Sequence, residues 1–439
     1  MRIPPRPPDP SDVWRSADDA TQLRMLRVGS SDQGRYLAWD EVRHRQSPEG
    51  LTVEQWWTGM RLARDQVARQ IPSEPARWRP FTYSLVDPVL EKLHLMDQQA
   101  AGRLSAPAPI LDPSTRDRYA INGLIEEAIA SSQIEGAVAT RAAAREMIRQ
   151  GRKPRDESEQ MILNNFAAIR YIAEVRSADL SDEIVLTLHR MLTEGTLEES
   201  FAGRFQLPSD ERVVVTDVRD GTVVHIPPPA AEIPERMEAM YRFANGVEGG
   251  FVHPLVRAIG LHYWLAHDHP FFDGNGRTAR ALFYWAALRA GYWLTEFVSI
   301  SRVIVRAPVR YGRAFVYSET DRNDLTYFLI HQLEVLEEAF AGVWGYVEEK
   351  QREILAAERL LRSLPSVNHR QRALIGHALR KRGFRYTFQS HATSHGVTRQ
   401  TARSDLLALA KLGLLDATRQ GRRVEFIAPD DLNERLQQR

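Results

Sequence analysis

HPFFDGNGRTAR, from His269 to Arg280, is the stretch of this 439-residue sequence that says most about its fold. Apolar residues at helical spacing precede and follow it, which predicts a loop between two helices. Gly274, Asn275 and Gly276 lie where the second helix begins, with little side-chain bulk around their backbone N–H groups. Such N–H groups and the helix dipole together favour an anion. The loop is therefore predicted to bind phosphate.

Charged residues of the same loop suit a polyphosphate. Arg277 and Arg280 are three residues apart, so both guanidinium groups can face one cluster of oxyanions. Asp273 offers a hard oxygen ligand for a magnesium ion that also binds phosphate, although an aspartate before glycine is more often a turn residue. His269, with an ordinary pKa of about 6.5, is a candidate general base. A lone histidine would carry little weight without these neighbours.

The loop resembles the signature of the Fic family, which reads His, Pro, Phe, any residue, Asp or Glu, Gly, Asn, Gly, Arg, any two residues, Arg. Every specified position matches. The resemblance continues through HPLVRA at residues 253–258, LHYWLAHDH at 261–269 and FAGR at 201–204, and it covers roughly residues 116–340. It implies a mainly α-helical core and a protein adenylyltransferase, which moves AMP from ATP to a Tyr, Ser or Thr hydroxyl of a target protein.

The resemblance also implies roles for individual residues. His269 would be the general base and Asp273 the ligand of Mg²⁺. Gly274, Asn275, Gly276 and Arg277 would hold the α- and β-phosphates of the co-substrate ATP, and Arg280 the γ-phosphate. Two β-branched runs joined by Arg-Asp-Gly predict a hairpin over about residues 212–226. In the family this hairpin is a flap that receives the target by strand addition; the alternative is a hairpin that only packs.

A second motif, SSQIEG at residues 131–136, lies upstream of the loop. It resembles the inhibitory helix of self-inhibited Fic proteins, in which Ser or Thr is followed four residues later by Glu and then by Gly or Asn. Ser131 and Glu135 share a helix face, and Gly136 ends the helix. The resemblance implies that Glu135 pairs with Arg280 and occupies the γ-phosphate site. The alternative is an exposed helix end with no regulatory role.

Related enzymes with the same glutamate also remove AMP, so deAMPylation stays open, as does transfer of another nucleotidyl or phosphoryl group. An alternative of a different class is a DNA-binding transcriptional regulator in which the Fic core acts as a sensing or dimerising body. The intact His269 and Asp273 favour the enzyme, because a regulatory body needs neither a base nor a metal ligand. A homodimer is expected only from the resemblance.

Composition excludes several classes of protein. The chain has no cysteine, so neither a disulfide framework nor a thiolate metal site is expected. No apolar run approaches the roughly 18 residues of a membrane span, and the first ten residues lack the apolar stretch of a signal peptide. A cytoplasmic protein without membrane partners is the resulting expectation.

Charge is distributed unevenly along the chain. Residues 366–439 contain 14 Lys and Arg against 6 Asp and Glu, although the whole chain has a formal charge of only +1. This segment resembles a winged helix-turn-helix, which predicts DNA as a partner, while a protein-docking winged helix is the alternative. The residues expected to contact DNA are Arg399, Gln400, Arg403, Arg422 and Arg423.

The pattern of apolar residues and breakers gives the expected organisation of the chain. Helices are predicted over residues 140–150, 157–176, 181–192, 232–245, 254–267, 276–290 and 325–364. The expected domains are an N-terminal helical region (1–100), a Fic core (101–345) with inhibitory helix (about 117–136), flap (about 212–226) and catalytic loop (269–280), a helical linker (346–368) and a winged helix-turn-helix (369–439). The expected fold class is mainly α.

Overall fold

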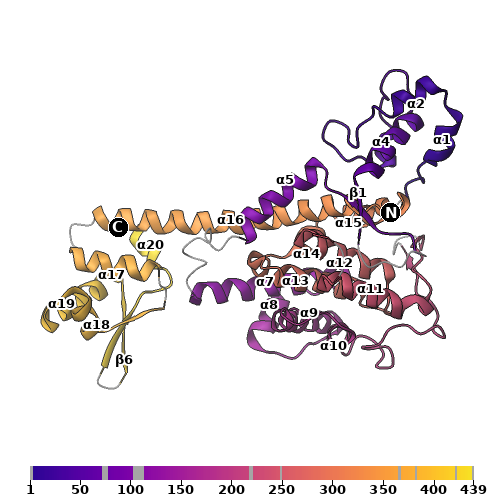
Figure 1. Cartoon of the computed structure of the whole chain (residues 1–439). Coiled ribbons are helices and arrows are strands. Elements are labelled where there is room, and N and C mark those ends of the chain that lie inside the picture. The colour runs from indigo at the N-terminus through magenta and orange to yellow at the C-terminus, as the bar shows by residue number, and fades with distance from the viewer. Residues whose placement is uncertain are drawn as a thin grey trace. The chain divides into compact units, whose positions relative to one another are not determined.

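The computed structural model describes residues 3–71, 78–101, 113–216, 221–247, 250–363, 367–380, 383–420 and 423–437. Helices make up most of it and the strands are short, so the predicted mainly α fold is confirmed (Figure 1). The chain divides into two compact units. The core unit is Met1–Ser105 with Tyr119–Ala341, and the C-terminal unit is Ala106–Arg118 with Gly342–Arg439. None of the described helices combines the length and apolar character that a membrane crossing requires.

The core unit begins with short elements around a cluster of tryptophans. Trp56, Trp57 and Met60 on one face of α4 pack with Leu37 and Val42, which gives this region a small hydrophobic core of its own. The elements are α1 (Pro10–Ser16), α2 (Asp19–Met25), α3 (Trp39–Val42), α4 (Val53–Val67), β1 (Ala68–Gln70), β2 (Thr82–Ser84), α5 (Asp87–Met96) and the π-helical turn η1 (Asp97–Ala101). Strands β1 and β2 pair antiparallel.

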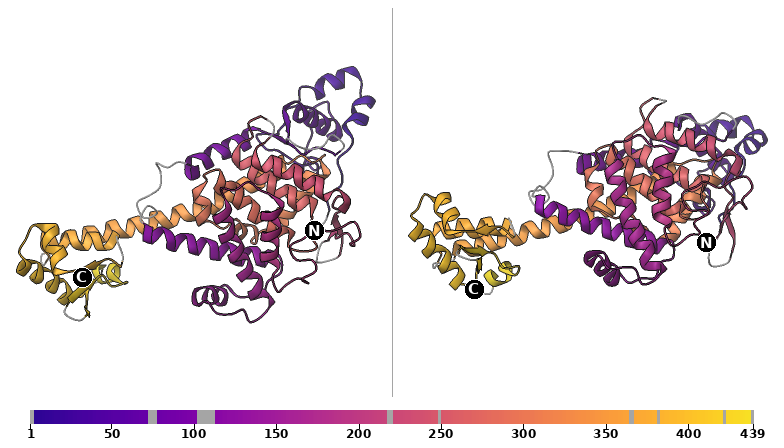
Figure 2. Two further views of the ribbon diagram at one scale, coloured as in Figure 1. Left: turned by 60° about the horizontal axis from the view of Figure 1, so that its bottom comes forward. Right: turned by 90° about the horizontal axis from the view of Figure 1, so that it is seen from below.

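The remaining elements of the core unit are almost all helical, as Figure 2 shows from two further sides. They are α7 (Pro113–Ile134), α8 (Arg141–Gln150), α9 (Glu157–Val175), α10 (Asp182–Thr193), β3 (Val215–Thr216), β4 (Val223–His225), η2 (Ala230–Glu232), α11 (Ile233–Asn245), α12 (Pro254–Asp268), α13 (Asn275–Arg289), η3 (Trp293–Phe297), α14 (Ile300–Ile304), α15 (Pro308–Thr320) and α16 (Thr326–Ser363). Helix α16 continues beyond Ala341 into the C-terminal unit.

Helices α12 and α13 form the centre of the core unit. Each is buried on nearly every side, and Trp264 of α12 and Trp285 of α13 are fully buried. Other elements surround them, since α9, α10 and α12 pack on α13, and α11 packs on α12. The loop that joins α12 to α13 is therefore fixed at both ends by the most buried part of the protein.

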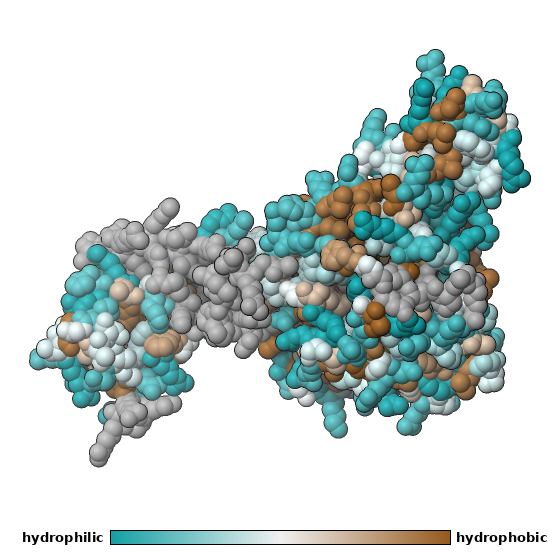
Figure 3. Space-filling view, viewed as in Figure 1, coloured by the Kyte–Doolittle hydropathy of each residue, from teal (hydrophilic) through white to brown (hydrophobic). Residues whose placement is uncertain are grey.

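The C-terminal unit has its own apolar core, which includes Leu406 and Leu409 of α19 and Phe426 of β7. Its elements, after the end of α16, are α17 (His369–Arg380), β5 (Arg385–Tyr386), α18 (Phe388–His395), α19 (Arg399–Lys411), β6 (Asp416–Gln420), β7 (Arg423–Ile427) and α20 (Leu432–Gln437). The strands form an antiparallel sheet in the order β5-β7-β6. Most of this unit's described surface in Figure 3 is hydrophilic.

Candidate active site

The loop between α12 and α13 makes two turns that most residues avoid. His269 ends α12 with a φ of 48°, in the left-handed region, and its N–H donates to the Leu265 carbonyl at 2.9 Å. Gly274 precedes α13 with a φ of 79°, and a Cβ there would lie 3.0 Å from Cγ2 of Thr193. Glycine alone accepts both the backbone angle and the close approach without strain. A non-glycine residue such as His269 in this region marks a strained position.

Asn275 fastens this loop to itself. Its Oδ1 accepts from the Phe271 N–H at 2.9 Å, and its Nδ2 donates to the Phe271 carbonyl at 2.9 Å. The buried side chain of Asn275 therefore bonds within the loop, and this residue contributes only its backbone to the start of α13. Gly274 provides no capping oxygen for this helix. The first N–H groups of α13 consequently lack a side-chain partner and are free to bind an anion.

His189 of α10 holds the loop in place through hydrogen bonds and ring stacking, a role that the sequence did not indicate. Its Nδ1 accepts from the Gly203 N–H at 2.9 Å, so Nε2 carries the hydrogen that is donated to the Asp273 carbonyl at 2.8 Å. The ring stacks on Phe271 at 3.8 Å between centroids. Burial lowers the pKa of His189 to about 4, which keeps the ring neutral and this tautomer fixed at pH 7.

His269 presents one ring nitrogen to the site. Its Nδ1 lies 3.3 Å from the Ala266 carbonyl, which favours the hydrogen on Nδ1 and leaves the lone pair on Nε2. Burial lowers the pKa of His269 to about 4, against the opposing effects of the Ala266 carbonyl and the Glu135 carboxylate. At neutral pH the ring is therefore uncharged, and Nε2 is able to accept a proton.

Arg212 joins the flap to the entrance of the loop, and it too was missed in the sequence. Its guanidinium donates to the carbonyls of His269 at 2.8 Å and Asp268 at 2.6 Å, and its Nε donates to the Pro228 carbonyl at 2.8 Å. Strands β3 and β4 pair antiparallel over the predicted hairpin, although residues 217–220 of its turn lie outside the described residues. These bonds hold the base of the hairpin beside the candidate base.

Arg277 and Asp273 form one ion pair. The buried guanidinium of Arg277 donates to Asp273 Oδ2 at 2.7 Å and to the Leu192 carbonyl at 2.9 Å. The Asp273 side chain is 51% exposed, so its carboxylate reaches the open side of the loop. Among the described residues there is no group of three or more His, Cys, Asp or Glu placed to hold a metal ion. One carboxylate fits Mg²⁺ only if phosphate and water oxygens complete the coordination.

Arg280 and Glu135 meet as the second motif implies. Arg280, 1% exposed, donates from Nη2 to Glu135 Oε1 at 2.8 Å and to the Ser131 carbonyl at 3.0 Å, and from Nε to Ser131 Oγ at 2.9 Å. Burial acts to lower the pKa of Arg280, but the groups around it, the Glu135 carboxylate first among them and then Tyr311 and Glu127, together raise the pKa. Gly136 follows helix α7 with a φ of 99°.

The Glu135 carboxylate also lies on the first turn of α13. A Cβ built on Gly276 would be 2.4 Å from Glu135 Oε1 and 3.2 Å from an Arg280 nitrogen. Glycine at this position is what allows the carboxylate to come so close. An internal anion thus occupies the place where the helix dipole, the uncapped N–H groups and a buried guanidinium favour negative charge.

Glu127 holds helix α7 against the core, and no signal in the sequence marked it. Its buried carboxylate accepts from the hydroxyls of Tyr284 at 2.9 Å, Ser299 at 2.7 Å and Ser301 at 2.5 Å, and from the Ser301 N–H at 3.0 Å. One turn earlier, a Cβ on Gly123 would lie 2.7 Å from the backbone of Phe297, so the two segments touch. These contacts fix the helix that carries Glu135.

The residues predicted to contact DNA belong to the C-terminal unit. Arg399, Gln400 and Arg403 are exposed on one face of α19, whose opposite face is buried. Thr398 caps this helix by accepting from the Thr401 N–H at 3.2 Å. Arg422 lies outside the described residues. Arg423 begins β7, but its side chain is not among those described.

Comparison with known proteins bears on the core unit. Residues 179–287 match the model of the Fic/DOC family. Over 133 residues, 30% of this chain, the sequence is 34% identical to proteins named protein adenylyltransferase Fic from Drosophila sechellia and Drosophila melanogaster. The match covers 25% of those relatives, so the chain spans about a quarter of their length.

A solved structure extends the similarity to most of the chain. The crystal structure of a Fic family protein from Desulfovibrio desulfuricans G20 superposes with a TM-score of 0.52 and covers 79% of this chain and 98% of that one. The two sequences are 21% identical, and the likeness therefore concerns the fold.

Proposed function

The chain carries a Fic/DOC family domain at residues 179–287, and from this premise we propose that it transfers AMP from ATP to a hydroxyl of a target protein. One observation carries the proposal. The Glu135 carboxylate, an anion, rests on the start of α13 and on Arg280, beside a neutral His269 whose Nε2 is available. A polyphosphate would bind to the same partners, and Nε2 would accept the proton of a hydroxyl placed beside it.

In the proposed reaction the hydroxyl oxygen of the target attacks the α-phosphorus of ATP, and its proton passes to Nε2 of His269. The bond between the α-phosphorus and the bridging oxygen breaks, and pyrophosphate leaves. The N–H groups at the start of α13 stabilise charge on the phosphates, and Arg280 binds the terminal phosphate. Strand addition to the flap would place the hydroxyl.

Asp273 is the residue that would hold Mg²⁺. Its half-exposed carboxylate and its place beside the uncapped start of α13 suit an ion that takes most of its ligands from phosphate and water. When bound, the ion would neutralise charge on the phosphates. Arg277 keeps the Asp273 carboxylate in position through its 2.7 Å contact, and His189 holds the carbonyl of the same residue.

Glu135 is proposed to inhibit the enzyme from within the chain. While its carboxylate occupies Arg280, the terminal phosphate of ATP has no guanidinium partner, and a productive pose of the nucleotide is prevented. Keeping the competent state near 1% requires only about 2.7 kcal/mol. Arg280 is buried, although the Glu135 side chain is 26% exposed. Separating the two leaves a buried guanidinium without its counter-charge, a cost of the size that this role requires.

The test uses ATP labelled on either the α- or the γ-phosphate, with magnesium, and label on protein as the readout. We expect α-label on Glu135→Gly, far less on the wild type, and none on Glu135→Gly with His269→Ala. Gln133→Gly, which loosens the same helix end but keeps the carboxylate, should resemble the wild type. Label from the γ-phosphate would indicate phosphoryl transfer, and label from neither position would contradict the transferase.

DNA binding by the C-terminal unit is the second proposed function, because Arg399, Gln400 and Arg403 share one exposed face of α19. A helix with such a face can enter a major groove. Fluorescence anisotropy of a labelled duplex, measured against salt, tests this. Each arginine that contacts a phosphate should contribute about one to the salt slope, so Arg399→Ala with Arg403→Ala should lower it by about two. An unchanged slope would favour the protein-docking alternative.

A further inference from the structure

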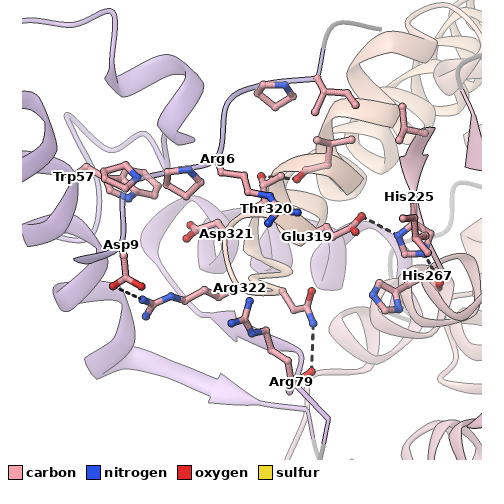
Figure 4. Close-up of a pocket in the computed structure, with 18 of the residues that line it drawn as sticks. Arg6, Asp9, Trp57, Arg79, His225, His267, Glu319, Thr320, Asp321 and Arg322 are labelled. Carbon is pink, nitrogen blue, oxygen red and sulfur yellow. Dashed lines mark hydrogen bonds and ion pairs between the residues drawn. The ribbon is translucent and has the colours of Figure 1, made fainter. Parts of the chain in front are cut away.

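A pocket of about 640 Å³ lies beside the flap strand β4 (Figure 4). Residues 223–226 of the flap line it, together with His267, two residues before the candidate base. Its other sides come from the N-terminal residues 3–4 and 6–10 and from residues 319–323 at the end of α15. The residues that surround Arg280 do not line it. This β4 pocket is therefore separate from the phosphate site, but it adjoins the strand that is proposed to receive the target.

The turn at the end of α15 holds an arginine in a strained conformation. Arg322 and Asn323 have φ values of 61° and 62°, and a non-glycine residue keeps the left-handed conformation only where its surroundings impose it. Here the Thr82 N–H donates to the Asn323 carbonyl at 3.0 Å, and Asn323 Nδ2 donates to the Arg79 carbonyl at 3.3 Å. The turn thereby places Arg322 and the chain at Arg79 around one opening.

A buried polar network beneath this turn joins it to the N-terminal region. Arg61 of α4, 3% exposed, lies 3.2 Å from Asp321 and 2.9 Å from Asp324. Tyr36 donates to Asp324 at 2.5 Å, and Tyr327 donates to Asp321 at 2.8 Å. Both carboxylates are thus neutralised inside the protein. The N-terminal region therefore has a structural role, because it helps to form this wall of the β4 pocket.

The opposite wall is stiff for a different reason. Proline fixes φ, and the segment that carries Arg6 is rich in it. Its prolines are Pro4, Pro5, Pro7, Pro8 and Pro10, of which the first and the last are buried. Arg6 is therefore an exposed side chain on a short, anchored and extended segment, and little backbone conformational entropy is lost when it binds a ligand.

The charges that remain available in the pocket are positive. Asp9 accepts from the Ser11 N–H at 2.8 Å and lies 3.6 Å from Arg322, and Glu319 lies 2.9 Å from His225 Nδ1. The Nε2 of His225 is 2.6 Å from the His267 carbonyl, so both ring nitrogens face acceptors. Each acidic side chain in the lining thus has a partner.

By contrast, Arg6 and Arg79 are exposed, and neither guanidinium has a side-chain partner in the part of the chain that the structure describes. Both are labelled in Figure 4 among the residues that line the pocket. A ligand that fits this pocket would carry negative charge.

We propose that the β4 pocket binds an acidic side chain of the target polypeptide, on the segment that lies along β4, through Arg6 and Arg79. The inference rests on the proposed function, because it takes the flap as the place where the target binds. A guanidinium pairs with a carboxylate in two parallel hydrogen bonds, so recognition there selects charge and geometry together. The enzyme would then prefer targets with Asp or Glu close to the modified hydroxyl.

The test is a binding measurement on the full-length Glu135→Gly protein without nucleotide. The probes are a fluorescent ten-residue peptide with one Tyr and three Glu, and the same peptide with Gln in place of Glu, compared by anisotropy at low salt. We expect the Glu peptide to bind at least about tenfold more tightly, a difference that Arg6→Gln with Arg79→Gln removes. Arg27→Gln, at an exposed arginine away from the pocket, should preserve it.

Equal affinity for the two peptides, or a difference that survives the double substitution, would overturn the proposal. So would a difference abolished by Arg399→Gln with Arg403→Gln instead, because the peptide would then bind the basic C-terminal unit. Binding of a phosphotyrosine peptide in place of the Glu peptide would also reject it. Since no nucleotide is present, a failure of AMP transfer would leave this readout unchanged, and the two hypotheses can fail separately.

Discussion

The loop at residues 269–280 and the end of α7 at residues 131–136 face each other but are held very differently. The loop is bonded to α10, to the flap and to itself, and Arg280 within it has a side chain only 2% exposed. The Glu135 side chain is 26% exposed, and a single ion pair holds its carboxylate. The loop is thus held firmly by its surroundings, whereas the contact of Glu135 with Arg280 can break without a rearrangement of the loop.

The largest effect is expected from the loop. With Glu135→Gly as the background, His269→Ala should lower the rate of label transfer by at least about 10²-fold to 10⁴-fold, because no other group there would take the proton. Single-turnover assays at saturating ATP measure this. His267→Ala, two residues earlier in the last turn of α12, is the matched control for disturbance of the loop entrance. Equal losses in both variants would mean that His269 is structural.

A second substitution probes the loop's own fastening. Asn275→Ala removes both bonds to Phe271 and leaves a buried N–H and a buried carbonyl without partners, so we expect the free energy of unfolding to fall by about 3 kcal/mol. Urea denaturation of the full chain measures the change. Gln133→Ala, at the less firmly held end of α7, should change the free energy of unfolding by less than about 0.5 kcal/mol. A small effect of Asn275→Ala would show that the loop does not depend on this side chain.

The pH dependence of stability gives a third test. Burial lowers the pKa of His189 to about 4, below the value of about 6.5 in the unfolded chain. Between these values the unfolded chain binds more protons, so stability falls as the pH falls from 6.5 toward 4. From pH 7 to pH 5 the loss attributable to His189 should be about 2 kcal/mol, measured as the difference between wild type and His189→Gln. Equal pH profiles for the two would contradict the buried neutral ring.

The smallest effect concerns how firmly α7 packs against the core. Glu127→Gln keeps the size of the side chain but replaces one accepting oxygen with an NH₂ group that faces hydroxyl partners. We expect looser docking of α7, the proposed inhibitory helix, and a rise of about fivefold in self-labelling, the equivalent of about 1 kcal/mol. Glu126→Gln, on the next position of α7, should produce a smaller change because its partners are Arg145 and other exposed arginines. The reverse order would mean that Glu127 is not what seats the helix.

The sequence predicted those features that depend on short stretches. Periodicity placed a helix at residues 276–290, and α13 spans Asn275–Arg289. It placed another at 254–267, and α12 spans Pro254–Asp268. The motif at residues 131–136 implied the contact between Glu135 and Arg280, which are 145 residues apart. A motif makes such a long-range contact predictable because both halves have their own sequence pattern.

Other parts of the site could not be predicted, because their roles come only from tertiary contacts. The sequence does not distinguish His189 from any other buried histidine of an amphipathic helix. Only the fold stacks its ring on Phe271. Arg212 and Glu127 bind carbonyls and hydroxyls from distant segments, and neither type of partner leaves a pattern in the sequence. The same holds for Arg322, whose strained turn is stabilised by a network that begins in α4. The domain limits and the winged-helix interpretation stay predictions.

Glu135 and a polyphosphate are proposed to compete for one anion site at the start of α13. Isothermal titration with inorganic tripolyphosphate, which has neither a base nor a sugar, measures this competition. We expect clear binding to Glu135→Gly, at least about tenfold weaker binding to the wild type, and loss of binding when Arg280→Ala is added to Glu135→Gly. Equal binding to the wild type and to Glu135→Gly would contradict it, because the carboxylate would then not occupy the phosphate site.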